Sequence, residues 1–176
     1  MQDRHNINGF NQLFKGGEAA IHRVVAHNTH ENISRVQEGG TSLLLFGTLT
    51  EQRTHDEPGK DETGLDQWSV LTLKGDGVQT RVVYGYNPCN NKNPNSGTSY
   101  QQHCRYFITK KGNLTCPRTK FREDLVAQLT KWRKEGEHLI VFLDANKHIY
   151  KKSIGEALTD IDGLTYFQGS KPINGA

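Results

Sequence analysis

Hydrophobic positions recur at different spacings along this chain, and each spacing predicts one kind of element. Thr41 to Phe46 follows Gly39-Gly40 as a mostly apolar run, which predicts a strand. Trp68 to Leu73 and Thr80 to Tyr86 are rich in β-branched and aromatic residues. The glycine-bearing segment Gly75-Asp76-Gly77 lies between them, so these two runs predict a β-hairpin.

The second half of the chain changes to a helical spacing and then to a continuous apolar run. Apolar residues recur at intervals of four and three residues, which predicts the buried face of an amphipathic helix. These residues are Phe121, Leu125, Leu129 and Trp132. Gly136 is the expected stop of this helix. Leu139 to Leu143 follows as an uninterrupted apolar run, which predicts a strand buried on both faces.

The remaining segments are polar and mostly predict loops. His55 to Gly64 is charged and is expected to be a solvated loop, and Asn87 to Ser99 is rich in Asn, Pro, Gly and Ser. Tyr100 to Phe107 is a candidate helix. Met1 to Glu38 is polar and weakly periodic, with a short apolar island at Ile21 to Ala26. The order of hairpin, loop, amphipathic helix and buried strand predicts an α/β sandwich with mixed strand directions.

Length, charge and cysteine content restrict the class of protein. The chain has 176 residues, enough for a single domain with a substantial core over residues 1–176. Its net charge of +3 permits a polyanionic partner without requiring one. Cys89, Cys104 and Cys116 lack the CxxC spacing of a zinc site. Because no apolar stretch approaches the roughly 20 residues of a membrane span, we expect an intracellular protein of the nucleus or cytoplasm, with no membrane partner.

Polar residues stand at the ends of two predicted strands. Asp144 and Asn146 end the apolar run, and Tyr86-Asn87-Pro88 ends the returning strand of the hairpin. Ligand sites in α/β sheets gather at the carboxyl ends of strands. Asp144 and Asn146 are two residues apart on the expected strand, so both side chains would face one substrate. A strand that simply ends in an Asp/Asn turn explains the same pattern.

These motifs together resemble the endonuclease/exonuclease/phosphatase superfamily, most closely its retrotransposon-type endonuclease-like members. The motifs that carry the resemblance are Gly39-Gly40-Thr41, Trp68-Ser69-Val70, Val82-Val83-Tyr84-Gly85-Tyr86, Gln101-Gln102, Lys131-Trp132-Arg133-Lys134 and Leu143-Asp144-Ala145-Asn146. The last is the most specific, since it is similar to the Gly-Asp-x-Asn strand end of the family. The resemblance implies a four-layered α/β sandwich, with two packed mixed β-sheets flanked by helices and incomplete here at both termini.

The resemblance also implies hydrolysis of phosphodiester bonds with Mg²⁺ as cofactor and nucleic acid, most simply DNA, as partner. Asp144 would orient or deprotonate the attacking water, and Asn146 would donate a hydrogen bond to a phosphoryl oxygen. Tyr86 would contact the phosphate. The expected substrate-binding residues are Asn87, Lys147 and His148. A solvated surface explains the basic cluster around Lys147 equally well.

The chain departs from the family at the positions that bind the metal. The best match to the Gln-Glu motif of the family is Gln2-Asp3-Arg4-His5-Asn6, in which Arg4 falls on the metal-binding Glu if His5-Asn6 are aligned. Asp3 would serve only after a one-residue shift, which turns a strand side chain to the opposite face. Asn174 stands where the family has Asp, and the closing Asp-His pair is absent. These departures predict weakened or absent hydrolysis. The alternative function is a catalytically incomplete nucleic-acid-binding remnant of such an endonuclease domain.

Overall fold

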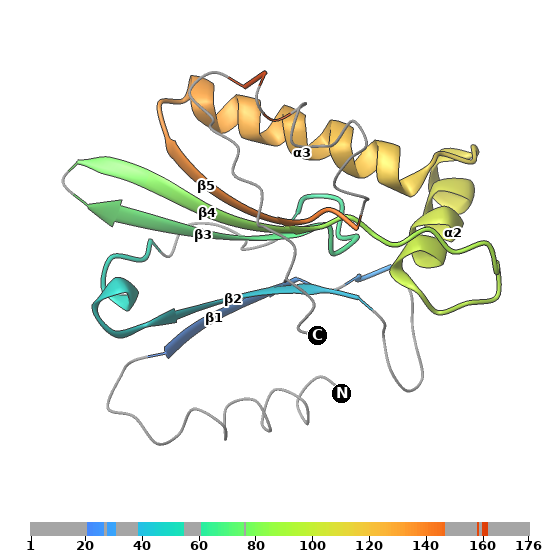
Figure 1. Cartoon of the computed structure of the whole chain (residues 1–176), viewed down its shortest axis with the longest axis horizontal. Helices are drawn as coiled ribbons and strands as arrows, with labels where there is room; N and C mark the ends of the chain where they lie inside the picture. The colour runs from blue at the N-terminus through green and yellow to red at the C-terminus, as the bar shows by residue number, and fades with distance from the viewer. Residues whose placement is uncertain are drawn as a thin grey trace, which may run out of the picture.

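The structure, a computed structural model, describes residues 21–26, 28–30, 39–54, 61–75, 77–146, 158 and 160–161. This part of the chain contains two packed β-sheets and two α-helices (Figure 1), which confirms the predicted α/β class. None of its helices has the length and apolar character that a membrane span requires. The predicted incompleteness at the termini concerns residues outside the described ranges.

The smaller sheet is an antiparallel pair of strands, β1 (Ile21–Ala26) and β2 (Thr41–Phe46). The bounds of β2 match the strand that the sequence predicts. The sequence identifies β1 only as an apolar island, because six residues without clear alternation carry little strand signal on their own. Pairing along the whole length of β2 makes this segment a strand, with Ala26 opposite Thr41. A short 3₁₀ turn, η1 (Gly47–Thr50), follows β2.

The larger sheet has the order β3-β4-β5 and contains both strand directions. β3 (Trp68–Gly75) and β4 (Val78–Tyr86) form the predicted antiparallel hairpin. Gly77 at its turn has a φ of +79°, a conformation that glycine adopts without strain. β5 (His138–Asp144) runs parallel to β4, so the prediction of mixed strand directions is confirmed.

Two helices connect β4 to β5. α2 (Ser99–Lys111) confirms and extends the candidate helix, and α3 (Pro117–Lys134) begins one turn before the predicted apolar face. Proline is well suited to the first turn of α3, because the N–H that it lacks has no partner within the helix there. Gly136 follows the helix with a φ of +84°, which confirms it as the residue that ends this element.

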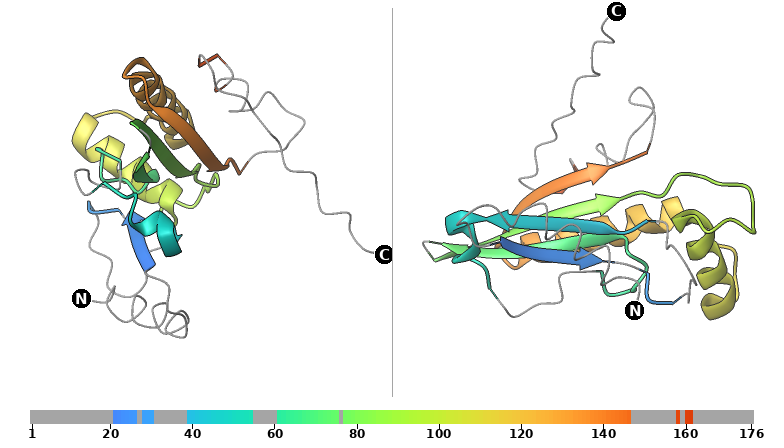
Figure 2. Two further views of the ribbon diagram at one scale, coloured as in Figure 1. Left: turned by 90° about the vertical axis from the view of Figure 1, so that its left-hand side faces the viewer. Right: turned by 90° about the horizontal axis from the view of Figure 1, so that it is seen from below.

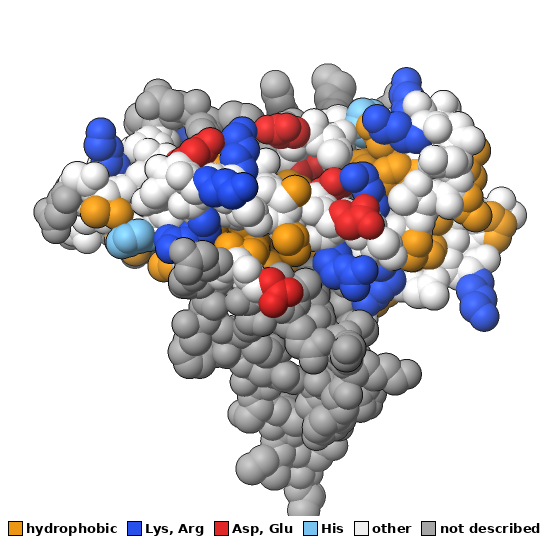
Figure 3. Space-filling view, turned by 90° about the horizontal axis from the view of Figure 1, so that it is seen from above, with side chains coloured by type: hydrophobic (Ala, Val, Ile, Leu, Met, Phe, Trp, Pro, Cys, Tyr) orange, Lys and Arg blue, Asp and Glu red, His pale blue; other side chains and the backbone are white. Residues whose placement is uncertain are grey.

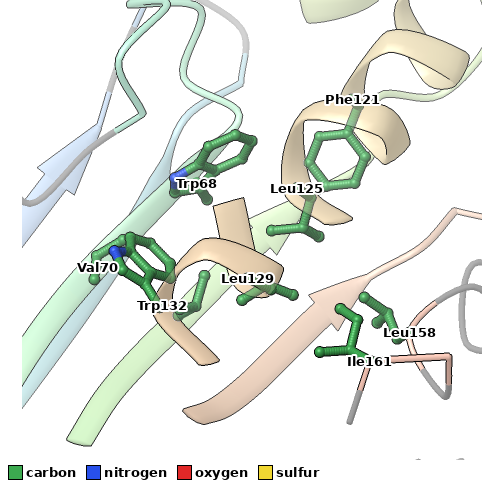
Figure 4. Packing of buried hydrophobic residues seen from close by; sticks show 9 residues of the cluster. Trp68, Val70, Phe121, Leu125, Leu129, Trp132, Leu158 and Ile161 are labelled. Atoms are coloured by element: carbon green, nitrogen blue, oxygen red, sulfur yellow. The ribbon is translucent and has the colours of Figure 1, made fainter. Parts of the chain in front are cut away.

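The main core lies between α3 and one face of the larger sheet. Figure 4 shows its side chains interdigitating there. The cluster comprises Trp68, Val70, Val83, Phe121, Leu125, Leu129, Trp132, Leu158 and Ile161. All four residues of the predicted helix face are therefore confirmed as core. Complete burial of a leucine or phenylalanine side chain contributes about 1.5–3 kcal/mol each, so this interface dominates the stability of the described part.

The smaller sheet covers the opposite face of β3 and β4. β1 and β2 both pack against β3, and β2 also packs against β4. The hydroxyls of Thr41 and Ser69 form a buried hydrogen bond of 2.7 Å between the sheets. Figure 2 shows α3, the larger sheet and the smaller sheet as successive layers. A fourth layer outside β1 and β2, as the resemblance implies, is not formed by the described residues.

The prediction that Leu139 to Leu143 is buried on both faces is wrong. The side chains of Leu139, Val141 and Leu143 pack against the core cluster on the α3 side. Ile140 and Phe142 are 48% and 54% exposed, respectively. β5 is an edge strand of the described sheet, and its main packing partners there are β4 and α3. The second sheet covers β3 and β4 instead, so only one face of β5 becomes buried.

Candidate functional site

Two neighbouring strands end in side chains that face the same way. Tyr86, the last residue of β4, lies opposite Asp144, the last residue of β5. The preceding pair, Gly85 and Leu143, faces α3, since a Cβ on Gly85 would lie 3.3 Å from the Phe121 ring. Successive residues alternate between the faces of a sheet, so Tyr86 and Asp144 point away from α3. We call these two residues the strand-end pair.

Gln67 lies beside the strand-end pair on the other flank of β4. Its carbonyl oxygen accepts a hydrogen bond of 3.0 Å from the Tyr86 N–H. The side chain of Gln67 is fully buried, and its amide nitrogen donates to the Thr63 hydroxyl over 3.2 Å. The side-chain oxygen of Gln67 has no hydrogen-bond partner within the described part. The structure therefore places Gln67, Tyr86 and Asp144 side by side at one end of the larger sheet.

Asp144 and Asn146 do not lie on one strand, so the prediction that strand geometry points both side chains the same way is wrong. β5 ends at Asp144, and Asn146 has a φ of +44°, which turns the chain. The Asp144 carboxylate accepts a hydrogen bond of 3.2 Å from the Asn146 N–H, as in an Asp/Asn turn. The Asp144 side chain is nevertheless exposed, so its carboxylate remains open to a ligand.

Asn87 and Asn146 lock the two strand ends together. The Asn87 backbone N–H donates to the Asp144 carbonyl over 2.9 Å, and its side-chain amide donates to the Ala145 carbonyl over 3.0 Å. The Asn146 amide donates in return to the Asn87 carbonyl over 2.8 Å. The structure thus brings Tyr86, Asn87, Asp144 and Asn146 together. Each asparagine side-chain amide donates one hydrogen bond to a backbone carbonyl of the other loop. These bonds fix the two loops relative to each other.

Arg118, in the first turn of α3, bonds to both of these loops. Its guanidinium donates to the Pro88 carbonyl over 2.8 Å. It also donates to the carbonyls of Ala145 and Asn146 over 3.2 and 3.0 Å. Sequence reasoning missed this residue, because a basic side chain early in an amphipathic helix is usually part of its solvated face. No local pattern distinguishes Arg118 from the neighbouring cations of the helix.

The environment of Tyr86 keeps its phenol protonated. Burial raises the pKa of Tyr86 above its usual value of 10.0, and the neighbouring side chains of Cys89, Asp144 and Asp66 act in the same direction. A hydrogen bond from the Cys89 backbone opposes these effects only in part. At neutral pH the Tyr86 hydroxyl is therefore a neutral hydrogen-bond donor beside an exposed carboxylate.

A buried polar turn supports Gln67, contrary to the expectation of a solvated loop up to Gly64. Asp61 is only 3% exposed, and its carboxylate accepts hydrogen bonds from the Gln67 N–H (2.8 Å) and the Leu65 N–H (3.3 Å). The Thr63 hydroxyl donates to the same carboxylate. A buried turn exposes backbone N–H groups that need acceptors, and Asp61 supplies them. Residues 55–60 of the expected loop lie outside the described ranges.

Helix α2 holds the same turn from the other side. Asp66 has a φ of +63°, and His103 Nε2 lies 2.6 Å from the Leu65 carbonyl and 3.1 Å from an Asp66 carboxylate oxygen. The Asn28 amide donates to the Gln102 side-chain oxygen over 3.0 Å. All these side chains are buried. Sequence reasoning did not identify Asp66 or His103, because they are distant in sequence and belong to no local motif.

The described residues do not fit a magnesium site by themselves. Among them no three His, Cys, Asp or Glu side chains lie close enough together to hold a metal ion. Asp144 is the one carboxylate of the strand-end pair, whereas magnesium sites lean on one or two carboxylates with a substrate phosphate. The candidate metal ligands Asp3 and Asn174 lie outside the described residues. So do Lys147 and His148.

The fold and the strand-end pair define a mixed α/β protein with a polar cluster at the carboxyl ends of two parallel strands. No family model, curated protein or solved structure matches the chain.

Proposed function

We propose that this chain is an endonuclease-like phosphodiesterase domain that binds DNA at the strand-end pair and hydrolyses it slowly. The observation that supports this most is the meeting of Tyr86 and Asp144 in register on adjacent parallel strands. The carboxyl ends of such strands are the usual ligand sites of α/β sheets. The resemblance to the endonuclease/exonuclease/phosphatase superfamily supplies the reaction class and Mg²⁺ as cofactor.

The two side chains suit complementary tasks in phosphodiester hydrolysis. The protonated Tyr86 hydroxyl would donate a hydrogen bond to a phosphoryl oxygen. Asp144 would accept a proton from a water whose oxygen forms the new bond to phosphorus. The ester P–O bond on the opposite side breaks, and the leaving alkoxide takes a proton from solvent. Slow turnover is expected because Arg4 and Asn174 stand where the family has metal-binding carboxylates.

The surface over α3 is a poor candidate for the DNA contact. Figure 3 shows acidic and basic side chains interspersed on this face. Lys120, for example, is paired with Asp124 at 2.7 Å on the helix surface. Nucleic-acid footprints require clustered positive charge instead. We therefore propose the DNA contact at the strand ends rather than over the helix.

The decisive test is nicking of supercoiled plasmid with Mg²⁺ by the wild type and by Asp144→Ala. We expect slow nicking by the wild type, loss of nicking in Asp144→Ala and inhibition by a chelator. Glu123→Ala is the matched control, since it removes an exposed carboxylate on α3. Equal nicking by the wild type and Asp144→Ala would contradict the proposal.

A DNA-binding remnant without hydrolysis is the second candidate. It is favoured by the lack of a metal-binding group among the described residues. Binding through phosphate contacts weakens steeply with salt, because bound cations are released from the DNA. Salt-sensitive DNA binding without any nicking would support this second function.

A further inference from the structure

We propose that Arg118 is a positioning residue that fixes the two loops which directly follow Tyr86 and Asp144. The proposal rests on the function proposed above. Arg118 donates to Pro88, two residues after Tyr86, and to Ala145 and Asn146, the two residues after Asp144. One side chain therefore bridges the two loops that continue the strand-end pair.

The helix that carries Arg118 is itself fixed against the same strands. Phe121, one turn further along α3, is fully buried in the core. Its ring packs against Gly85, the residue directly before Tyr86, and a Cβ on Gly85 would lie only 3.3 Å away. The first turn of α3 thus has a defined position relative to the end of β4. Arg118 transfers that position to the end of β5.

The chemistry of this bridge requires arginine. A guanidinium presents several N–H donors in a rigid plane, so it reaches carbonyls on two separate loops at once. The ammonium of lysine is a compact group on a flexible stem, and it cannot span the same acceptors with fixed geometry. A lysine at this position would keep the charge and lose the bridge. This difference separates positioning from simple attraction of a phosphate.

The acceptors of Arg118 are all uncharged carbonyls, and it forms no ion pair within the described part. Among the described residues no carboxylate therefore neutralises its positive charge. The half-buried guanidinium keeps this charge beside the two loops that follow the strand-end pair. Arg118 serves the site through its hydrogen-bonded bridge, and its charge adds a favourable field for an anion.

The test compares Arg118→Ala and Arg118→Lys with Arg122→Ala, which removes an exposed cation one turn further along α3. Small misplacements of reacting groups cost up to about 10²-fold in rate, so we expect a fall of about 10- to 100-fold in kcat for both Arg118 variants. KM should change far less. Added guanidinium ion should partly restore Arg118→Ala, whereas Arg122→Ala should nick like the wild type. Full nicking by Arg118→Ala would overturn the proposal.

A second readout keeps this result separate from the proposed function. The side-chain amide NMR signals of Asn87 and Asn146 report on the two loops directly. We expect both signals to shift in Arg118→Ala, to return with guanidinium ion and to stay unchanged in Arg122→Ala. If the wild type does not nick but the signals behave in this way, the proposed function fails and the positioning role stands. Unmoved signals in Arg118→Ala would overturn the positioning role, whatever the nicking assay shows.

Discussion

An arginine lies at each end of α3, Arg118 in its first turn and Arg81 beside Trp132 near its last turn, and their environments differ. Near the end of the helix, Arg81 is 3% exposed and donates two hydrogen bonds to the Glu137 carboxylate, with its guanidinium 4.6 Å from the centre of the Trp132 ring. At the start of the helix, Arg118 is half-buried, and its hydrogen bonds to described residues all go to backbone carbonyls. Within the part of the chain that the structure describes, one arginine has a carboxylate partner and the other has none.

This difference separates a structural role from a functional one. A buried arginine with a carboxylate and an aromatic face has no capacity left for a ligand anion, so the Arg81 end serves the fold. The Arg118 end holds two loops, an exposed carboxylate and a protonated phenol, with a positive charge beside them. Changes at the first end should therefore lower stability, and changes at the second should lower DNA cleavage.

The largest effect on stability is expected from Glu137→Ala. The substitution leaves the buried guanidinium of Arg81 without its carboxylate, and such losses cost about 3–5 kcal/mol. Urea unfolding followed by circular dichroism measures this change. Glu135→Ala is the control, because Glu135 is exposed and two residues away. A loss as small as that of Glu135→Ala would contradict the assignment of this end as structural.

Asn87→Ala should have a smaller effect. It removes the side-chain bond to the Ala145 carbonyl, but Arg118 still donates to that oxygen. The acceptor is not left unsatisfied, so we expect a loss of about 1 kcal/mol. Nicking should fall by much more than this change in stability explains, because Asn87 directly follows Tyr86 and its backbone N–H donates to the Asp144 carbonyl. Thermal unfolding measures the effect on stability, and plasmid nicking measures the effect on cleavage. Asn90→Ala is the control, because Asn90 is exposed. An unchanged nicking rate in Asn87→Ala would contradict a role of Asn87 in positioning the strand-end pair.

Much of the fold follows from local patterns in the sequence. The hairpin follows from two runs rich in β-branched and aromatic residues around a glycine-bearing turn, and α3 follows from apolar residues at intervals of four and three; both are confirmed. The prediction that β5 is buried on both faces is wrong, because an apolar run does not show how far a second sheet extends over the strand. The prediction that Asp61 lies in a solvated loop is also wrong. A charged residue usually indicates exposure, and the sequence does not show that the Asp61 carboxylate accepts hydrogen bonds from buried backbone N–H groups.

The site was only partly predictable, for a related reason. Tyr86 and Asp144 are recognisable because each follows an apolar strand, and parallel pairing then brings them together. Asn146 was placed on a strand that in fact ends two residues earlier. Arg118 could not be recognised, since its acceptors are backbone carbonyls that exist at every position. A contact to a backbone carbonyl does not restrict which residue types the partner segment contains.

Tyr86→Phe should change stability by no more than about 1 kcal/mol, since it removes one hydroxyl. Its value lies in the pH dependence. The pKa of Tyr86 is raised in the folded state, so the stability from the neutral phenol is present below pH 10.0 and is lost as the pH rises through the higher folded pKa. The difference in phenolate absorbance between the wild type and Tyr86→Phe measures this titration. A midpoint at or below 10.0 would contradict the conclusion that burial and the neighbouring groups raise the pKa of Tyr86.

Asp144→Asn should have the smallest effect on stability, within about 0.5 kcal/mol, because the side chain is exposed. The amide oxygen of asparagine still accepts the hydrogen bond from the Asn146 N–H, so the turn remains intact. The substitution removes only the negative charge and the capacity to take a proton from water. Loss of nicking with unchanged thermal stability would therefore assign the carboxylate to the reaction. Retained nicking would mean that Asp144 only caps the turn, and the contrast between the two ends of α3 would then lie in stability alone.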